Sequence, residues 1–214
     1  MQHNIFNQMP GYRAYEYQLV LALPEVLSRK IMQAKKSFRE TIGSAAAAGS
    51  RPWLSLAAFT QLEMMEEKLT GRLKTVAMGF RPFLLELKDY GHFPAHTIYL
   101  PVSRKEGIRQ LIREIKPLRR LMKQDPEHKP YFTEDPYIVI GRKLTPAQFE
   151  KAWSLYQHKH FSGRFIADAM LLLKRPVGAG PYQVAARLPF ENLPVNTRQG
   201  DLFAFQGADV EWAF

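Results

Sequence analysis

The chain has 214 residues, 46% of them hydrophobic, which is enough for the core of one large domain or two small ones. The absence of cysteine excludes disulfides, thiolate nucleophiles and cysteine-ligated zinc. The formal net charge of +10 favours an anionic partner such as phosphate or nucleic acid. A basic surface that only keeps the protein in solution is an equal alternative, because the charge is spread along the chain.

The sequence also bounds location and cofactors. No apolar run approaches the length that spans a bilayer, and the first residues lack the order of a signal peptide. We therefore expect no membrane contact and a cytoplasmic location. We expect no cofactor and no metal, since His92 and His96 are separated by a turn and a proline rather than by one turn of helix. The sequence leaves the oligomeric state open.

The first half of the chain alternates strand and helix patterns. Residues 15–23 are aromatic, branched and then apolar, which indicates a strand. The helix expected from Pro24 to Gly43 has an apolar face of Leu27, Ile31, Phe38 and Ile42. A second helix should follow Phe59, with an apolar side of Leu62, Met65, Leu69, Leu73 and Val76. A strand over 83–87 and a turn over 89–92 complete this half.

The second half repeats this order with one extra strand. A strand over 97–102 precedes a helix that should begin at Ser103, with Glu106 at the capping-box spacing. Pro117 should kink or divide this helix. Thr145 should cap a fourth helix. Residues 161–173 form a long strand or a bent pair, and 182–190 a final strand.

Two stretches with the same form stand at the centre of this order. Residues 52–59 read PWLSLAAF and residues 136–144 read PYIVIGRKL. Since side chains alternate across a strand, Trp53 and Ser55 share one face, and Tyr137 and Val139 share the matching face of the second strand. The aliphatic residues between them should enter the core.

These elements predict an α+β fold with mainly antiparallel sheets. We expect one two-lobed domain over 1–214, with lobes of about 15–95 and 96–190 related by a pseudo-twofold axis. The twin strands should line a central cleft, with helices outside. Residues 191–214 are expected to be a tail that packs across the body.

The duplicated order and the run PYIVIGRKL resemble the 2H phosphoesterase superfamily, which includes the bacterial 2'-5' RNA ligases and cyclic phosphodiesterases. The resemblance covers roughly residues 15–190. It implies a motif of histidine, any residue, threonine or serine and an aliphatic residue, once per lobe. The two histidines would act as general base and general acid on a 2'-hydroxyl and a phosphodiester, and the hydroxyls would hold phosphate.

This sequence departs from that motif at both histidines. The corresponding positions are Trp53 and Tyr137, and of the two hydroxyl positions only Ser55 keeps a hydroxyl, since the other is Val139. Acid–base catalysis works best with a pKa near the operating pH, which histidine has and tryptophan does not. The sequence therefore predicts negligible phosphodiester chemistry, with His96 as a candidate substitute acid or base.

Three functions follow from this arrangement. The first is a degenerate 2'-5' RNA ligase-like protein that binds a nucleotide, RNA or a protein partner. The second is an enzyme with altered acid–base residues, and the third is a structural or interaction protein whose cleft is filled by its own aromatic rings. The residues expected to contact a ligand are Trp53, Ser55, Tyr137, Arg51, Arg142 and Lys143.

The basic side of the third helix has a separate interpretation. Such a stripe is usually a solvated helix face, and contact with an RNA backbone is the less common alternative. Its members are Arg109, Arg113, Lys116, Arg119, Arg120 and Lys123.

Overall fold

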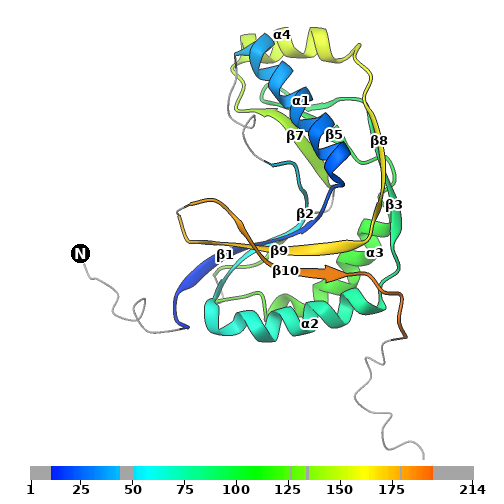
Figure 1. Cartoon of the computed structure of the whole chain (residues 1–214). Coiled ribbons are helices and arrows are strands. Elements are labelled where there is room, and N and C mark those ends of the chain that lie inside the picture. The colour runs from blue at the N-terminus through cyan, green and yellow to red at the C-terminus, as the bar shows by residue number, and fades with distance from the viewer. Residues whose placement is uncertain (1–10, 44–50, 126, 134, 179, 195–214) are drawn as a thin grey trace, which may run out of the picture.

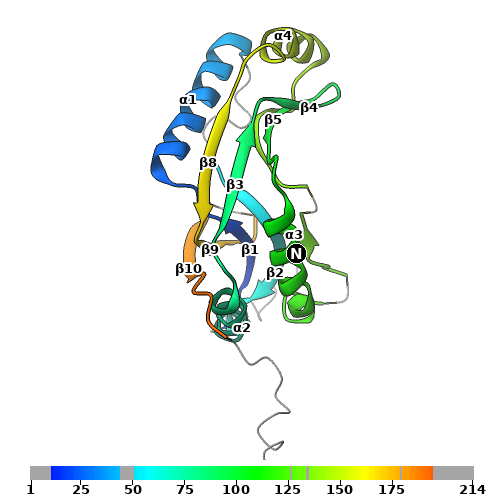
Figure 2. The ribbon, with the colours of Figure 1, turned by 90° about the vertical axis from the view of Figure 1, so that its right-hand side faces the viewer.

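The computed structural model describes residues 11–43, 51–125, 127–133, 135–178 and 180–194. Among them every strand pairing is antiparallel, which confirms the predicted α+β class. A large sheet lies at one end of the molecule and a smaller one at the other (Figure 1). A long strand pair runs along one side between them (Figure 2).

The large sheet has the order β10-β9-β1-β2-β6. Its strands are β1 (Ala14–Leu21), β2 (Leu54–Leu62), β6 (Tyr131–Phe132), β9 (Ala169–Pro176) and β10 (Gln183–Pro189). The small sheet, of order β4-β5-β7, contains β4 (Gly91–Phe93), β5 (Thr97–Pro101) and β7 (Tyr137–Arg142). The connecting pair is β3 (Phe83–Lys88) and β8 (Ser162–Ala167).

The helices cover the two ends separately. At the end of the small sheet lie α1 (Glu25–Ile42) and α4 (Pro146–Tyr156), and α1 packs on β7. At the other end, α2 (Glu66–Gly79) packs on β9 and β10 after a single 3-10 turn, η2 (Glu63–Met65). Beside it lies α3 (Glu106–Ile115), which continues as the 3-10 turn η3 (Lys116–Arg120) (Figure 1).

Several local predictions are confirmed. The apolar face predicted for the first helix is buried, and Gly43 ends α1 with a φ of 76°, a conformation that favours glycine. Thr145 forms a capping box with Gln148 at the start of α4. Pro117 divides the third helix as predicted, because it lacks the N–H that an α-helix needs.

Other local predictions are wrong. Ser103 caps no helix, because its hydroxyl donates to the Glu86 carbonyl at 3.1 Å and α3 begins three residues later. Leu62 ends β2 rather than starting a helix. The segment expected as a turn contains Gly91 of β4, which pairs with Tyr99 of β5.

The sheets do not follow the expected lobes of 15–95 and 96–190. The large sheet takes β1 and β2 from the first half of the chain and β6, β9 and β10 from the second. The physical reason is that residues 161–173 form a bent pair: β8 ends at Ala167 in the connecting ribbon and β9 begins at Ala169 in the large sheet. Each half of the chain therefore completes sheets begun by the other.

The two ends of the chain are partly described. Asn192 and Leu193 donate backbone hydrogen bonds to the carbonyls of Phe80 and Met78, so the start of the tail is fixed to the end of α2. The rest of the expected tail lies outside the described residues. No described helix has both the length and the apolar composition needed to cross a bilayer.

Candidate ligand-binding site

The twin strands carry the same irregularity at the same motif position. In β2 the register shifts between the partners of Leu19 and Val20, which leaves Leu56 as the extra residue. In β7 it shifts between the partners of Ile98 and Tyr99, which leaves Ile140 as the extra residue. Each bulge lies one residue after the third motif position, which is Ser55 in β2 and Val139 in β7. The two strands therefore have matching backbone geometry at the motif.

The alternation of side chains in both strands agrees with the prediction. Leu54 and Leu56 of β2 are buried, as are Ile138 and Ile140 of β7, and all four belong to one core cluster. The residues that alternate with them are partly exposed. We call the four partly exposed residues the twin-strand face: Trp53, Ser55, Tyr137 and Val139.

Trp53 lies in an apolar environment. It packs against a small apolar cluster of the large sheet, separate from the main core and formed by Val20, Leu171 and Leu173. The guanidinium of Arg51 lies over the indole, with its Cζ atom 4.8 Å from the ring centroid. Ser55 lies opposite Val20 across the β1–β2 ladder. The first motif thus presents one indole, one cation and one hydroxyl.

Tyr137 lies among aromatic rings. Its ring centroid is 4.9 Å from that of Tyr99 and 5.1 Å from that of Phe93. Tyr99 lies opposite Val139 across the β5–β7 ladder. The Tyr137 hydroxyl has no hydrogen-bond partner among the described residues, so it is available to a ligand.

The environment of Tyr137 determines its acid–base chemistry. Burial, followed by the neighbouring phenols of Tyr131 and Tyr99, raises the pKa of Tyr137 above its ordinary value. At neutral pH this hydroxyl therefore stays protonated and can donate a hydrogen bond to a ligand. It is a weaker candidate for a general base than an ordinary tyrosine.

His96 lies beside this aromatic cluster. Its ring centroid is 6.2 Å from that of Phe93, whose ring also contacts Tyr137. Its Nδ1 atom lies 2.6 Å from the Thr97 hydroxyl oxygen, so the neighbouring residue occupies one ring nitrogen. The other nitrogen is left for a ligand or for water.

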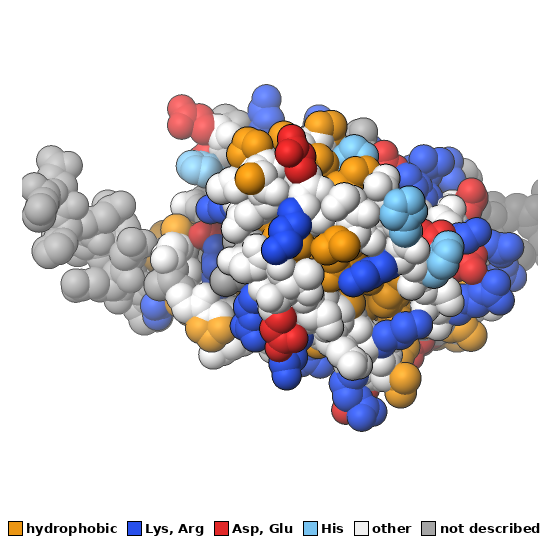
Figure 3. Space-filling view, turned by 90° about the horizontal axis from the view of Figure 1, so that it is seen from above, with side chains coloured by type: hydrophobic (Ala, Val, Ile, Leu, Met, Phe, Trp, Pro, Cys, Tyr) orange, Lys and Arg blue, Asp and Glu red, His pale blue; other side chains and the backbone are white. Residues whose placement is uncertain are grey.

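The predicted cations lie at the ends of the twin strands. Arg51 precedes β2, whereas Arg142 ends β7 and Lys143 follows it in the left-handed region with a φ of 55°. All three are exposed. On the face seen from above, basic side chains are interspersed with acidic ones and histidines rather than gathered in one patch (Figure 3).

Lys35, a neighbour of Arg142, is a buried charged residue that the sequence patterns did not single out. It lies on α1 and is only 2% exposed, and burial, followed by the charge of Arg142, lowers its pKa to about 8. One signal was present, because Lys35 lies four residues after Ile31 on the buried stripe that also holds Phe38. A lysine on an apolar stripe is usually assigned to its polar edge.

The structure holds the two motif aromatics in separate surroundings. Strands β2 and β7 contact each other, yet Trp53 packs with Val20 and Leu171 whereas Tyr137 packs with Tyr99 and Phe93. A cavity of about 270 Å³ lies farther along β1 and β2, beside Glu16, Thr60 and Tyr182. A larger, basic cavity lies on the side of η3.

The described residues contain no group of three or more histidine, aspartate and glutamate side chains arranged to hold a metal ion. The twin-strand face offers two aromatic rings and the hydroxyls of Ser55 and Tyr137, and the cations lie at the ends of its strands. Such groups stack on bases and donate hydrogen bonds to phosphate oxygens.

Comparison with known proteins connects this geometry to a family. A family model described as the 2'-5' RNA ligase superfamily matches residues 24–179. That range contains both twin strands and their matching bulges. The chain matches no curated protein.

Solved structures share the fold at low sequence identity. TT0787 of Thermus thermophilus aligns with a TM-score of 0.60 and 17% identity, over 82% of this chain and 98% of its own. E. coli LigT complexed with NADP+ aligns with a TM-score of 0.56 and 16% identity, over 83% and 99%. LigT complexed with 3'-AMP aligns with a TM-score of 0.57 and 16% identity, over 83% of this chain and 98% of its own.

Proposed function

Because the chain belongs to the 2'-5' RNA ligase superfamily, we propose that it binds a nucleotide- or RNA-like phosphate ligand at the twin-strand face without catalysing phosphodiester chemistry. The observation that carries this proposal is the pair of matching bulges at Leu56 and Ile140, which supports treating Trp53 and Tyr137 as equivalent positions of the two motifs. In the motif that the resemblance implies, these positions hold the two histidines.

The loss of catalysis follows from the chemistry of the two replacements. An indole has no proton that titrates near neutral pH, and the raised pKa of Tyr137 keeps its phenol protonated. A positioned acid or base contributes about 10²–10⁴-fold in rate, so the absence of both removes most of the ordinary mechanism. His96 could supply at most one of the two groups, and its Nδ1 atom already lies 2.6 Å from the Thr97 hydroxyl oxygen.

Binding follows from what the same residues offer. Tyr137 has a partly exposed ring and a hydroxyl available to a ligand, and Arg142 and Lys143 lie at the end of its strand. Stacking on an aromatic ring contributes about 1–3 kcal/mol per base. LigT, which shares this fold, has been crystallised with 3'-AMP and with ATP, and we infer that mononucleotides are suitable first probes.

A structural role is the second candidate, and the surroundings of Trp53 favour it. The indole covers Val20, Leu171 and Leu173, which are nearly fully buried. In this alternative Trp53 stabilises the large sheet and Tyr137 alone contacts the ligand. The two candidates differ in the effect of replacing Trp53.

The test measures binding of 3'-AMP and ATP by calorimetry to the wild type, Tyr137→Ala and Trp53→Ala. Loss of about 1–3 kcal/mol of binding free energy in both variants supports a ligand held by both rings. Loss in Tyr137→Ala alone, with Trp53→Ala lowering only the free energy of unfolding, supports the structural role of Trp53. No nucleotide binding by the wild type would overturn the proposal.

The catalytic part has its own test. We expect no turnover of 2',3'-cyclic or 2'-5' phosphodiesters by the wild type. The triple variant Trp53→His, Tyr137→His, Val139→Thr should gain activity, because it restores the motif on strands with equivalent bulges. Wild-type turnover that Tyr137→Phe abolishes would instead establish an enzyme with altered acid–base residues.

A further inference from the structure

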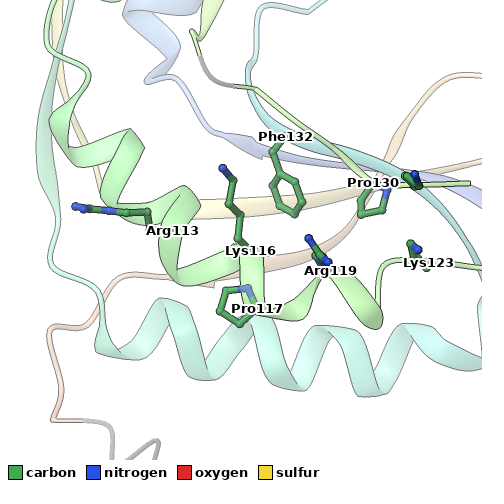
Figure 4. A pocket seen from close by; sticks show the side chains of 8 residues that line it. Arg113, Lys116, Pro117, Arg119, Lys123, Pro130 and Phe132 are labelled. Atoms are coloured by element: carbon green, nitrogen blue, oxygen red, sulfur yellow. The ribbon is translucent and has the colours of Figure 1, made fainter. Parts of the chain in front are cut away.

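A basic cavity lies outside the twin-strand face, between η3 and the segment that leads into β6 (Figure 4). Its volume is about 660 Å³, within the range of about 300–1,000 Å³ typical of ligand sites. Five cationic side chains line it together with the ring of Phe132: Arg113, Lys116, Arg119, Lys123 and Lys129. No aspartate or glutamate is among the described residues that line it.

The wall formed by η3 is fixed by a buried glutamine. Gln61 of β2 is 3% exposed, and its amide nitrogen donates to the carbonyls of Leu121 and Lys123 at 2.9 and 2.8 Å. These bonds hold the chain beyond η3 against the large sheet. Pro117 breaks the helix just before, so Lys116 and Arg119 lie on a short 3-10 turn beside the cavity (Figure 4).

The opposite wall is fixed by strand pairing. Phe132 of β6 pairs with Ala57 of β2, and the next residue, Thr133, donates its N–H to the Leu56 carbonyl at 3.0 Å. Lys129 therefore enters the cavity from a segment anchored to the same strand that anchors η3. Both walls are positioned before any ligand arrives.

The five cations have no ion-pair partner among the described side chains. Among the residues that the structure describes, none of the five forms an ion pair, whereas Lys105 and Arg109, at the start of α3, share Asp135. Like charges in one cavity repel one another, and an anion would relieve this repulsion. An elongated polyanion can meet cations on both walls at once.

We propose that this cavity binds the phosphodiester backbone of single-stranded RNA. The cations would contact successive phosphates, and Phe132 gives a base a ring to stack on. Successive phosphates of a strand can reach cations on both walls of the cavity, whereas 3'-AMP carries a single phosphate.

The test measures binding of a labelled oligouridylate of about twelve nucleotides by fluorescence anisotropy, from about 50 to about 200 mM salt. The cavity variant is Lys116→Gln, Arg119→Gln, Lys129→Gln. The matched control, Arg29→Gln, Lys36→Gln, Lys151→Gln, removes the same charge from exposed positions on α1 and α4. Circular dichroism confirms that both variants are folded.

We expect the cavity variant to lose at least about tenfold in affinity, and its slope of log affinity against log salt to fall by about 2, or about 0.7 for each lost phosphate contact. The control should keep both values within about twofold of the wild type. Equal losses in the two variants would overturn the proposal, since they indicate binding by net charge alone. Polyglutamate of matched charge binding as tightly as RNA would overturn it in favour of an acidic polypeptide.

Two further outcomes separate this site from the one proposed at the twin-strand face. In a competition assay, ATP should displace the labelled RNA less effectively than unlabelled oligouridylate does. Equal displacement by ATP would overturn the assignment of the cavity to an RNA strand. If Tyr137→Ala abolishes binding of 3'-AMP but leaves RNA binding intact, the result supports two independent sites.

Discussion

Lys35 links the pH of the solution to the stability of the fold. Its pKa is about 8 in the folded protein, because its side chain is buried and Arg142 lies nearby, and about 10.4 when unfolded. Between pH 8 and pH 10, Lys35 is therefore protonated to a greater extent in the unfolded chain than in the folded protein. Stability contributed through Lys35 therefore rises as the pH rises from about 8 to about 10.

The Lys35→Met variant should lack this rise. Relative to the variant, the free energy of unfolding of the wild type should increase by about 1–2 kcal/mol between pH 8 and 10, measured by urea denaturation at each pH. Lys36→Met, at the exposed neighbouring position, should follow the wild type. Parallel pH profiles for wild type and Lys35→Met would contradict the role given to Lys35. Buried tyrosines act in the opposite direction only above about pH 10.

Gly141 is required by the contact between α1 and β7. A Cβ atom at this position would lie 2.3 Å from Cε1 of Phe38, whose ring is buried. Gly141→Ala should therefore lower the free energy of unfolding by about 1–3 kcal/mol, as for other overpacked cores.

Gly71 provides the comparison. It lies in α2 with open space around it, so Gly71→Ala should stabilise the protein by about 0.5–1 kcal/mol through helix propensity. Urea denaturation of both variants checks the pair. A Gly141→Ala protein as stable as Gly71→Ala would show that the α1–β7 contact adapts without cost.

At the scale of elements, two serine and threonine caps were predicted and one forms. Thr145 accepts a hydrogen bond from the Gln148 backbone, whereas Ser103 donates to the Glu86 carbonyl instead. Thr145→Ala should cost about 0.5–2 kcal/mol of unfolding free energy. Ser103→Ala, at an exposed position, should cost less than about 0.5 kcal/mol. Thermal or urea denaturation compares them, and a larger loss for Ser103→Ala would reverse this assignment.

At the scale of the whole molecule, the sheets are shared between the two halves of the chain. Strand β1 lies between β2 and β9, and β3 pairs with β8, so neither half contains a complete large sheet. One core cluster also includes residues from both ends of the molecule. We therefore expect a single cooperative unfolding transition.

Fragments test this expectation directly. Residues 11–95 and 96–194, prepared separately, should show no cooperative urea transition by circular dichroism, whereas the full chain shows one that coincides by tryptophan fluorescence. A fragment that unfolds cooperatively alone would show that a lobe bounded near residue 95 is stable without the other half.

The sequence by itself determined which side chains the twin strands present. Alternation is local, so it correctly separated Leu54 and Ile138 from Trp53 and Tyr137. It also located the apolar face of α1, the division at Pro117 and the Thr145 cap, which depend on neighbours within a few residues. The tertiary structure alone decided the rest, including the rings around Tyr137, the burial of Lys35 and the second wall of the basic cavity. These depend on which distant strands pair, and that choice is set by burial summed over the whole chain rather than by any local pattern.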